Sequence, residues 1–236
     1  MESTSLNVQN NASHGVKVTM VRHGPGLMCY AVCGGMVMEV EEILDVWTRE
    51  GNWLGTASRQ AVHRWGLWHH TFQIWFVEMR DGKPWIWFQR RSPEKAQYGN
   101  LWDITVAGHL LSGETSQDGF REIREELGID LDPAQAFYFG VVADEIFESS
   151  GADRELCHVF FAWSPCDLKD LKWSRSEVAD VGAASLEDAA SLVTGLGDRM
   201  TITTGEAQYV INVGMLVPHS QTYYQRVFAG LRDYVG

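Results

Sequence analysis

Three glutamates, Glu122, Glu125 and Glu126, fall within the run REIREELG. At about 100° per residue of a helix they share one narrow arc, while the apolar Ile123 and Leu127 lie opposite. Like charges three or four residues apart repel by roughly 0.2–0.5 kcal/mol per pair, and a divalent cation would replace that repulsion with binding. Hard oxygen ligands suit Mg²⁺, which also bridges to phosphates. The run by itself also fits an ordinary solvated surface helix.

The segment before this helix favours the metal-binding interpretation. Gly108 and Gly113 allow the backbone to pass close to the helix, and Glu114 adds a further carboxylate nearby. In such a site one glutamate could act as a general base toward an attacking water. We therefore expect metal-assisted chemistry at residues 108–129.

Together these residues resemble the Nudix box, G-x5-E-x7-R-E-U-x-E-E-x-G-U, where U is a bulky aliphatic residue. The matching positions are Gly108, Glu114, Arg121, Glu122, Ile123, Glu125, Glu126, Gly128 and Ile129. Only six residues, 115–120, separate Glu114 from Arg121, which leaves the position and role of Glu114 open. The similarity to Nudix proteins extends over roughly residues 40–235.

The resemblance implies a fold and a metal-dependent site. The fold would be of the mixed α+β kind, a Nudix-type α/β/α sandwich around a mixed β-sheet. Arg121 would orient one of the helix carboxylates, forming a catalytic group with Glu122 and Glu125. The ligands of Mg²⁺ or Mn²⁺ would be Glu122, Glu125, Glu126, the carbonyl of Ala107 and an acid outside the box, for which Glu155 is the first candidate and Glu145 the second.

The runs TVAGH at 105–109 and WHHTF at 68–72 are similar to the Nudix branch that contains isopentenyl diphosphate isomerase. In that isomerase a Cys-Gly-His pattern supplies a proton-transferring thiol and a metal-binding histidine. Here Ala107 stands at the cysteine position, so isomerase chemistry is disfavoured, while His109 remains. His69 and His109 are candidates for contact with metal or diphosphate, with a structural role as the alternative.

Two arginines at the end of a predicted strand, Arg90 and Arg91, are candidates for phosphate binding. The planar guanidinium matches phosphate geometry, although an ordinary exposed pair of charges would also fit the pattern. Both arginines are therefore assigned to substrate binding as a hypothesis.

The function expected from the resemblance is divalent-metal-dependent hydrolysis of a diphosphate linkage in a small molecule, such as a nucleoside diphosphate linked to another moiety. An isomerase of the isopentenyl type and a non-catalytic Nudix binding domain are the alternatives. The formal net charge of −12 disfavours binding to nucleic acid. The oligomeric state is left open, with a homodimer as one possibility.

The four cysteines include no C-x-x-C pair, which fits a reducing cytoplasm. The longest weakly polar stretch, 24–38, is too short and too rich in glycine for a membrane span, and no membrane association is expected. Residues 1–39 are interpreted as an N-terminal extension, either poorly ordered or upstream of the true start, and 40–236 as the Nudix domain.

The elements that must position the box follow from periodicity and turn residues. Strands are predicted at 43–48, 53–57, 71–79, 85–89, 102–106, 137–142, 156–163 and 178–183. Helices are predicted at 115–127, from near Ser185, and at 220–234, with Gly128 as a left-handed helix end.

Overall fold

The computed structural model describes residues 3–6, 18–21, 31–33, 36–38, 41–148 and 151–236. By its internal contacts the chain divides into two units, Met1–Ile43 and Leu44–Gly236. The first unit contains two antiparallel pairs, β1 (Ser3–Leu6) with β2 (Val18–Val21) and β3 (Ala31–Cys33) with β4 (Met36–Met38). The predicted domain boundary at residue 39, and most of the segment predicted to lack order, lie outside the described residues.

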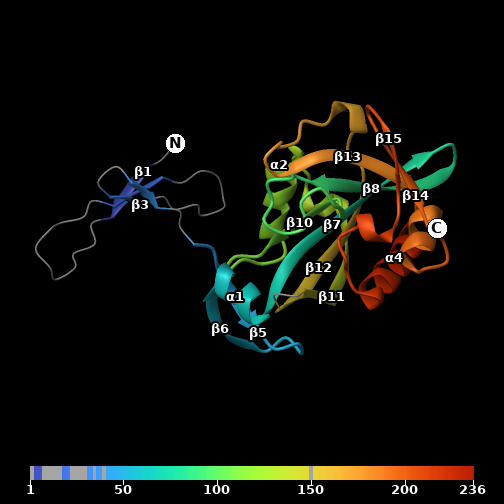
Figure 1. The fold of residues 1–236 in the computed structure, drawn as a ribbon. Helices are drawn as coiled ribbons and strands as arrows, with labels where there is room; N and C mark the ends of the chain where they lie inside the picture. Colours follow the sequence, from blue (N-terminus) through green and yellow to red (C-terminus); the bar gives the residue numbers. More distant parts are fainter. Residues whose placement is uncertain (1–2, 7–17, 22–30, 34–35, 39–40, 149–150) are drawn as a thin grey trace, which may run out of the picture. The chain divides into compact units, whose positions relative to one another are not determined.

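The second unit is built on a mixed sheet, as predicted (Figure 1). Its central strand, β7 (Trp68–Arg80), pairs in parallel with β12 (Gly151–Trp163) and antiparallel with β8 (Lys83–Arg91). Beyond these two strands the sheet continues with β11 (Ala136–Glu148) on one side and β13 (Val178–Ser185) on the other. The remaining strands are β5 (Ile43–Trp47), β6 (Trp53–Ser58), β9 (Trp102–Asp103), β10 (Val106–His109), β14 (Met200–Thr204) and β15 (Gln208–Ile211).

Helices cover both faces of this sheet. They are α1 (Arg59–Trp65), α2 (Arg121–Leu127), α3 (Leu186–Val193) and α4 (Gln221–Val235), together with the 3-10 turns η1 (Asp118–Phe120), η2 (Pro133–Gln135), η3 (Leu168–Asp170) and η4 (Val213–Met215). Among the described residues, no helix is both long enough and apolar enough to cross a membrane.

Alternating residues of β7 enter two different cores. Phe72, Ile74 and Phe76 pack with the apolar face of α2, whereas Trp75 and Val77 pack with residues of α3 and α4. Figure 1 shows α2 and α4 on opposite sides of the sheet. Because successive side chains of a strand point to opposite faces, the parity of a residue in β7 tells which helix layer it meets.

The predicted strand at 102–106 is wrong as one continuous element. β9 ends at Asp103 and β10 begins at Val106, and the side chain of Thr105 makes the bonds between them. Its Oγ1 accepts from the backbone N of Phe76 at 3.1 Å and donates to the carbonyl of Trp87 at 2.6 Å. A side-chain hydroxyl that bonds to the backbone in this way competes with the regular ladder.

The helix predicted from residue 115 begins later. Asp118 accepts from the backbone N and the hydroxyl of Thr115, so residues 115–118 form a turn, and η1 leads into α2 only at Arg121. The predicted end is confirmed, since Gly128 has φ of +67° and donates to the carbonyl of Arg124. The predicted starts of α3 and α4 are also confirmed, with Ser185 and Ser220 as N-caps.

The sequence interpretation missed α1, which supplies one side chain of the candidate site. Its signals were present in the residues: the hydroxyl of Ser58 accepts from the backbone N of Ala61, and Gly66 ends the helix with φ of +58°. These are the ordinary residue types for the two ends of a helix. The strands β14 and β15 were also missed.

Candidate active site

The helix α2 brings its glutamates against the edge strand β10. A Cβ atom at Gly108 would lie 2.2 Å from Cδ of Glu122, so only glycine lets this carboxylate approach the strand so closely. The apolar side of the helix is fixed by Ile123 and Leu127, which are buried against β7. The predicted opposition of a carboxylate face and an apolar face is therefore confirmed for Glu122, and Glu125 is also partly exposed.

Arg121 ties the helix to the box loop, by which we mean residues 110–117. Its guanidinium donates to both carboxylate oxygens of Glu114, at 3.1 and 3.0 Å, and to the carbonyl of His109 at 2.9 Å. It also contacts Glu122, and lies 3.5 Å from Glu125. Burial opposes the charge, but the bond to Glu114 and the neighbouring glutamates raise the pKa of Arg121, so it stays protonated.

The position of Glu114 follows from these bonds. Besides binding Arg121, its carboxylate accepts from the backbone N of Leu111 at 2.8 Å. Although only six residues separate it from Arg121, Glu114 therefore holds the box loop in place through these bonds. Its own role toward a metal stays open.

Glu126 is the most unusual carboxylate of the helix because it is buried. Its Oε2 accepts from Nε2 of Gln89 on β8 at 3.0 Å. Burial raises the pKa of Glu126 to about 8, with a further contribution from the negative charge of Glu122. A divalent cation beside Glu122 and Glu126 would offset the cost of the buried charge and the repulsion between them, so the oxygen donors of this face fit Mg²⁺ or Mn²⁺.

A second group of potential ligands lies on the other side of β10. Gly108 faces Glu122, so the next side chain, His109, points to the opposite face. There the ring nitrogens of His63, His69 and His109 lie within 4.8 Å of one another, and His69 forms a similar group with Asp153 and Glu155. We call these five residues the histidine cluster. They come from α1, β7, β10 and β12.

The polar atoms of the histidine cluster are incompletely satisfied. The Nδ1–H of His69 donates to the carbonyl of Leu67 at 3.0 Å, which leaves its buried Nε2 without a partner. Nδ1 of His63 and Nε2 of His69 lie 3.3 and 3.9 Å from Oδ1 of Asp153, and Nε2 of His63 lies 3.1 Å from Nε2 of His109. Burial lowers the pKa of His69 and lowers that of His109 further. Neutral imidazoles with free lone pairs are the form that binds a metal.

Glu155, predicted as a metal ligand beside the box helix, belongs instead to the histidine cluster. Its Oε2 accepts from Thr71 and from Gln73, both at 3.3 Å, on the face of β7 that meets α4. Burial, with Asp153 next, raises the pKa of Glu155 to about 8. The second candidate, Glu145, forms an ion pair with Arg154 at 3.1 Å.

The remaining predicted residues are separated by the fold. Arg91 donates to Asp103 at 3.0 Å and to the carbonyl of Gln97 at 3.3 Å, and its charge adds a small contribution to the lowered pKa of His109, of which burial is the main cause. Arg90 donates to Asn100 and lies over the ring of Tyr209. Ala107 is partly buried against the core that contains α3 and α4.

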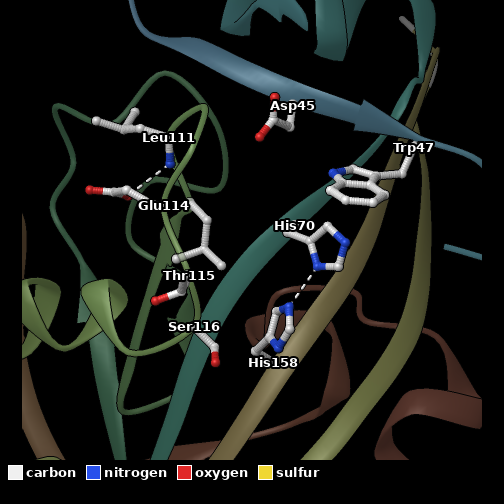
Figure 2. A pocket seen from close by; sticks show the side chains of 9 residues that line it. Asp45, Trp47, His70, Leu111, Glu114, Thr115, Ser116 and His158 are labelled. Atoms are coloured by element: carbon white, nitrogen blue, oxygen red, sulfur yellow. Dashed lines mark hydrogen bonds between the residues drawn. The ribbon is translucent and has the colours of Figure 1, made fainter. Parts of the chain in front are cut away.

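A cavity of about 310 Å³ lies between the box loop and β5 (Figure 2). In Figure 2, His70 and His158 point toward one another below Trp47, and their ring nitrogens are 2.6 Å apart. Burial lowers the pKa of His70, and that of His158 to about 4, so both rings are neutral near pH 7. None of the nine lining residues is then a cation.

Three residues of the site were not identified from the sequence: His63, Gln89 and Asp153. Asp153 is two residues before Glu155 on the same strand, and this spacing puts both on one face. That signal was available, whereas His63 could be found only with α1.

Comparisons with known proteins agree with this geometry. A family model described as the NUDIX domain matches residues 68–201. An uncharacterised Nudix hydrolase of Clostridium acetobutylicum is 32% identical over 202 residues, covering 82% of this chain and 98% of the relative. An isopentenyl-diphosphate Delta-isomerase of Aromatoleum aromaticum is 32% identical over 130 residues, covering 52% of this chain and 66% of the isomerase.

A solved structure, DR0079 from Deinococcus radiodurans, has a TM-score of 0.50 at 19% identity, covering 65% of this chain and 90% of that one. At this identity the likeness concerns the fold alone, and it confirms the predicted α+β sandwich. The family model and the Clostridium acetobutylicum relative, which is covered over 98% of its length, are instead similarities of amino-acid sequence. The chain therefore belongs to the Nudix family, and it is a hydrolase that acts on acid anhydrides.

Proposed function

We propose that this chain hydrolyses the diphosphate linkage of a small phosphorylated molecule, such as a nucleoside diphosphate linked to another moiety, with Mg²⁺ or Mn²⁺. The observation that carries the proposal is the buried carboxylate of Glu126 beside Glu122, whose own carboxylate lies where a Cβ atom at Gly108 would be. Uncompensated carboxylates are costly to bury, and a cation between them and a diphosphate removes that cost.

In this proposal Glu122, Glu125 and Glu126 hold the cation, with the carbonyl of Ala107 as a candidate ligand. The cation would stabilise the charge that develops on the phosphate oxygens. Arg121 orients Glu122 and Glu125, to which it is bound on its Nη1 side. An oxygen of these glutamates that does not bind the cation would accept the proton of the attacking water.

The histidine cluster supports a second cation of a different kind. The three imidazoles form one group, and His69 forms a second with the two carboxylates; such nitrogen and oxygen donors suit Mn²⁺, Zn²⁺ or Co²⁺ better than Mg²⁺. The buried Nε2 of His69, which has no hydrogen bond and lies 3.9 Å from Oδ1 of Asp153, is the observation that favours it. Glu155 keeps its proposed role as a metal ligand, at this cluster.

The isomerase alternative shares the fold and has a relative that bears that name. It lacks the required thiol, because Ala107 occupies the position and an alanine cannot transfer a proton. The non-catalytic alternative does not account for three helix glutamates of which one is buried. As part of the proposal we place the protein in the cytoplasm, which the free thiols of Cys157 and Cys166 support.

The test is release of phosphate or of a nucleoside monophosphate by the purified protein from a panel of diphosphates, with Mg²⁺ and with Mn²⁺. Glu126→Gln should abolish most of the turnover. Glu187→Gln, which changes an exposed glutamate in the first turn of α3, is the matched control and should leave turnover unchanged. Equal activity in both variants would remove the helix from the mechanism, and no turnover of any diphosphate by the wild type would refute the proposed reaction.

A further inference from the structure

A buried histidine lies between two buried aspartates at the start of the last helix. Nδ1 of His219 is 2.7 Å from Oδ2 of Asp144 on β11, and its Nε2 is 3.0 Å from Oδ1 of Asp103 on β9. All three side chains are buried, with at most 6% of their surface exposed. Three segments that are distant in the sequence therefore meet at one imidazole.

Both ring nitrogens of His219 donate, because both neighbours are carboxylates. Burial alone would lower the pKa of His219, but the bonds to Asp103 and Asp144 raise it to about 10. The same contacts lower the pKa of Asp103 to about 2 despite its burial. The group is thus a cation between two anions throughout the neutral range, and removing the cation would take a charged partner from each buried carboxylate.

Asp103 connects His219 to Arg91. One of its oxygens accepts from His219 and the other accepts from Nη1 of Arg91 at 3.0 Å. Asp103 is therefore fixed from both sides. Burial is the main cause of the lowered pKa of His109, and the charge of Arg91 makes a smaller contribution.

His219 is also connected to the histidine cluster through Tyr223 and Gln73. Its ring is stacked on Tyr223, with the centroids 4.8 Å apart. The hydroxyl of Tyr223 donates to Oε1 of Gln73 at 2.6 Å, and Nε2 of Gln73 donates to Glu155 at 3.3 Å. Arg91 and Glu155, one residue proposed for substrate and one for metal, are thus joined through His219.

We propose that His219 is a positioning residue: its imidazolium holds Asp103, and through Asp103 it fixes the guanidinium of Arg91 where a phosphate of the substrate binds. This inference rests on the proposed function, since it requires a diphosphate at the site. His219 itself does not touch the substrate. A purely structural role, fastening α4 to the sheet through Asp144, predicts a loss of stability without any specific coupling to Arg91.

The experiment is a double-mutant cycle read as the affinity for imidodiphosphate with Mg²⁺, measured by calorimetry. Arg91→Ala should weaken binding by about tenfold or more, the scale of a lost charge-assisted hydrogen bond to phosphate. His219→Gln should weaken it to a similar degree, because Gln carries no charge and cannot bond to both aspartates. The double variant should bind within about twofold of Arg91→Ala alone, since the two changes remove one function.

A matched control separates positioning from fastening of the helix. Ser220→Ala removes the hydroxyl that caps α4 at the backbone N of Tyr223, and leaves Asp103 and Arg91 untouched. It should lower the melting temperature and keep the affinity for imidodiphosphate. If His219→Gln does not fold, Asp103→Asn replaces it in the cycle, because it keeps the size and removes the charge that holds Arg91.

The outcomes distinguish the positioning role of His219 from the proposed hydrolase function. Additive effects of His219→Gln and Arg91→Ala, or unchanged affinity in His219→Gln, would overturn the positioning role while leaving the hydrolase proposal intact. A wild-type protein that neither binds imidodiphosphate nor turns over any diphosphate would instead contradict the proposed function.

Discussion

Replacing Glu126 with Gln should make the metal-free protein more stable while it removes activity. The substitution preserves the shape of the side chain, and the amide oxygen can still accept from Gln89. It removes only the ability to carry a charge in a buried position. The effect on stability must therefore depend on pH.

The magnitude follows from the pKa of Glu126, which burial raises from the ordinary 4.5 to about 8. Each unit corresponds to about 1.36 kcal/mol, so the wild type loses up to roughly 5 kcal/mol of stability between pH 4.5 and pH 8. Because folding raises the pKa of Glu126, the stabilisation that comes from its protonated form is fully present below pH 4.5. That stabilisation is lost as the pH rises through about 8. Glu126→Gln has no such loss.

The assay is thermal unfolding with a chelator at pH values from 4.5 to 9. The two proteins should melt alike at the acid end, and the variant should melt roughly 10 °C higher near pH 8, because about 1 kcal/mol shifts the midpoint by roughly 2–4 °C at this size. Added Mg²⁺ should raise the midpoint of the wild type and narrow the difference, since a ligand stabilises the state it binds. Glu187→Gln should show no pH-dependent difference from the wild type.

For the diphosphate that the panel identifies, turnover by Glu126→Gln should fall although the stability of this variant rises. Loss of several kcal/mol of charge stabilisation corresponds to a fall of roughly a hundredfold or more. A difference in melting temperature that is flat across this pH range would refute the argument from burial. Retained turnover in the more stable variant would refute the assignment of the metal helix.

Four further predictions concern other features of the chain. Gly108→Ala should abolish Mg²⁺-dependent turnover, because the new Cβ displaces the carboxylate of Glu122; activity close to that of the wild type would show that the strand and helix separate easily. Glu125→Gln, at a half-exposed position, should change the melting temperature by less than about 1 °C and still lower turnover steeply. A chain that begins at Met36 should keep both its melting temperature and its activity, and loss of the protein to aggregation would show that the removed segment packs on the core. Incubation with isopentenyl diphosphate should yield no dimethylallyl diphosphate, since Ala107 has no transferable proton, and its appearance would restore the isomerase alternative.

The sequence could be read correctly where the deciding interactions are local. The arc of α2 that contains Glu122 and the opposite apolar arc follow from the period of a helix. Gly128 ends this helix because glycine tolerates positive φ. Ser185 and Ser220 cap the helices that they precede for the same local reason. These features need no knowledge of what the segment packs against.

Errors arose where a side-chain hydrogen bond, local or tertiary, replaced a backbone preference. The extended run at 102–106 was interrupted because the hydroxyl of Thr105 binds two backbone groups on β7 and β8, both distant in the sequence. The start of α2 moved because Asp118 closes a turn with Thr115. Propensity alone does not anticipate such bonds.

The sequence by itself determined the box: which carboxylates lie on one arc of the helix, and that Ile123 and Leu127 are buried on the other. Only the tertiary structure decided where the other acids and bases lie. Gly108 and His109 are adjacent in the chain, yet the alternation of β10 sends one toward the helix glutamates and leaves the other among His63, His69, Asp153 and Glu155. The pairing of β7 with β12 brings residues more than 80 positions apart into register, and no local pattern specifies that register.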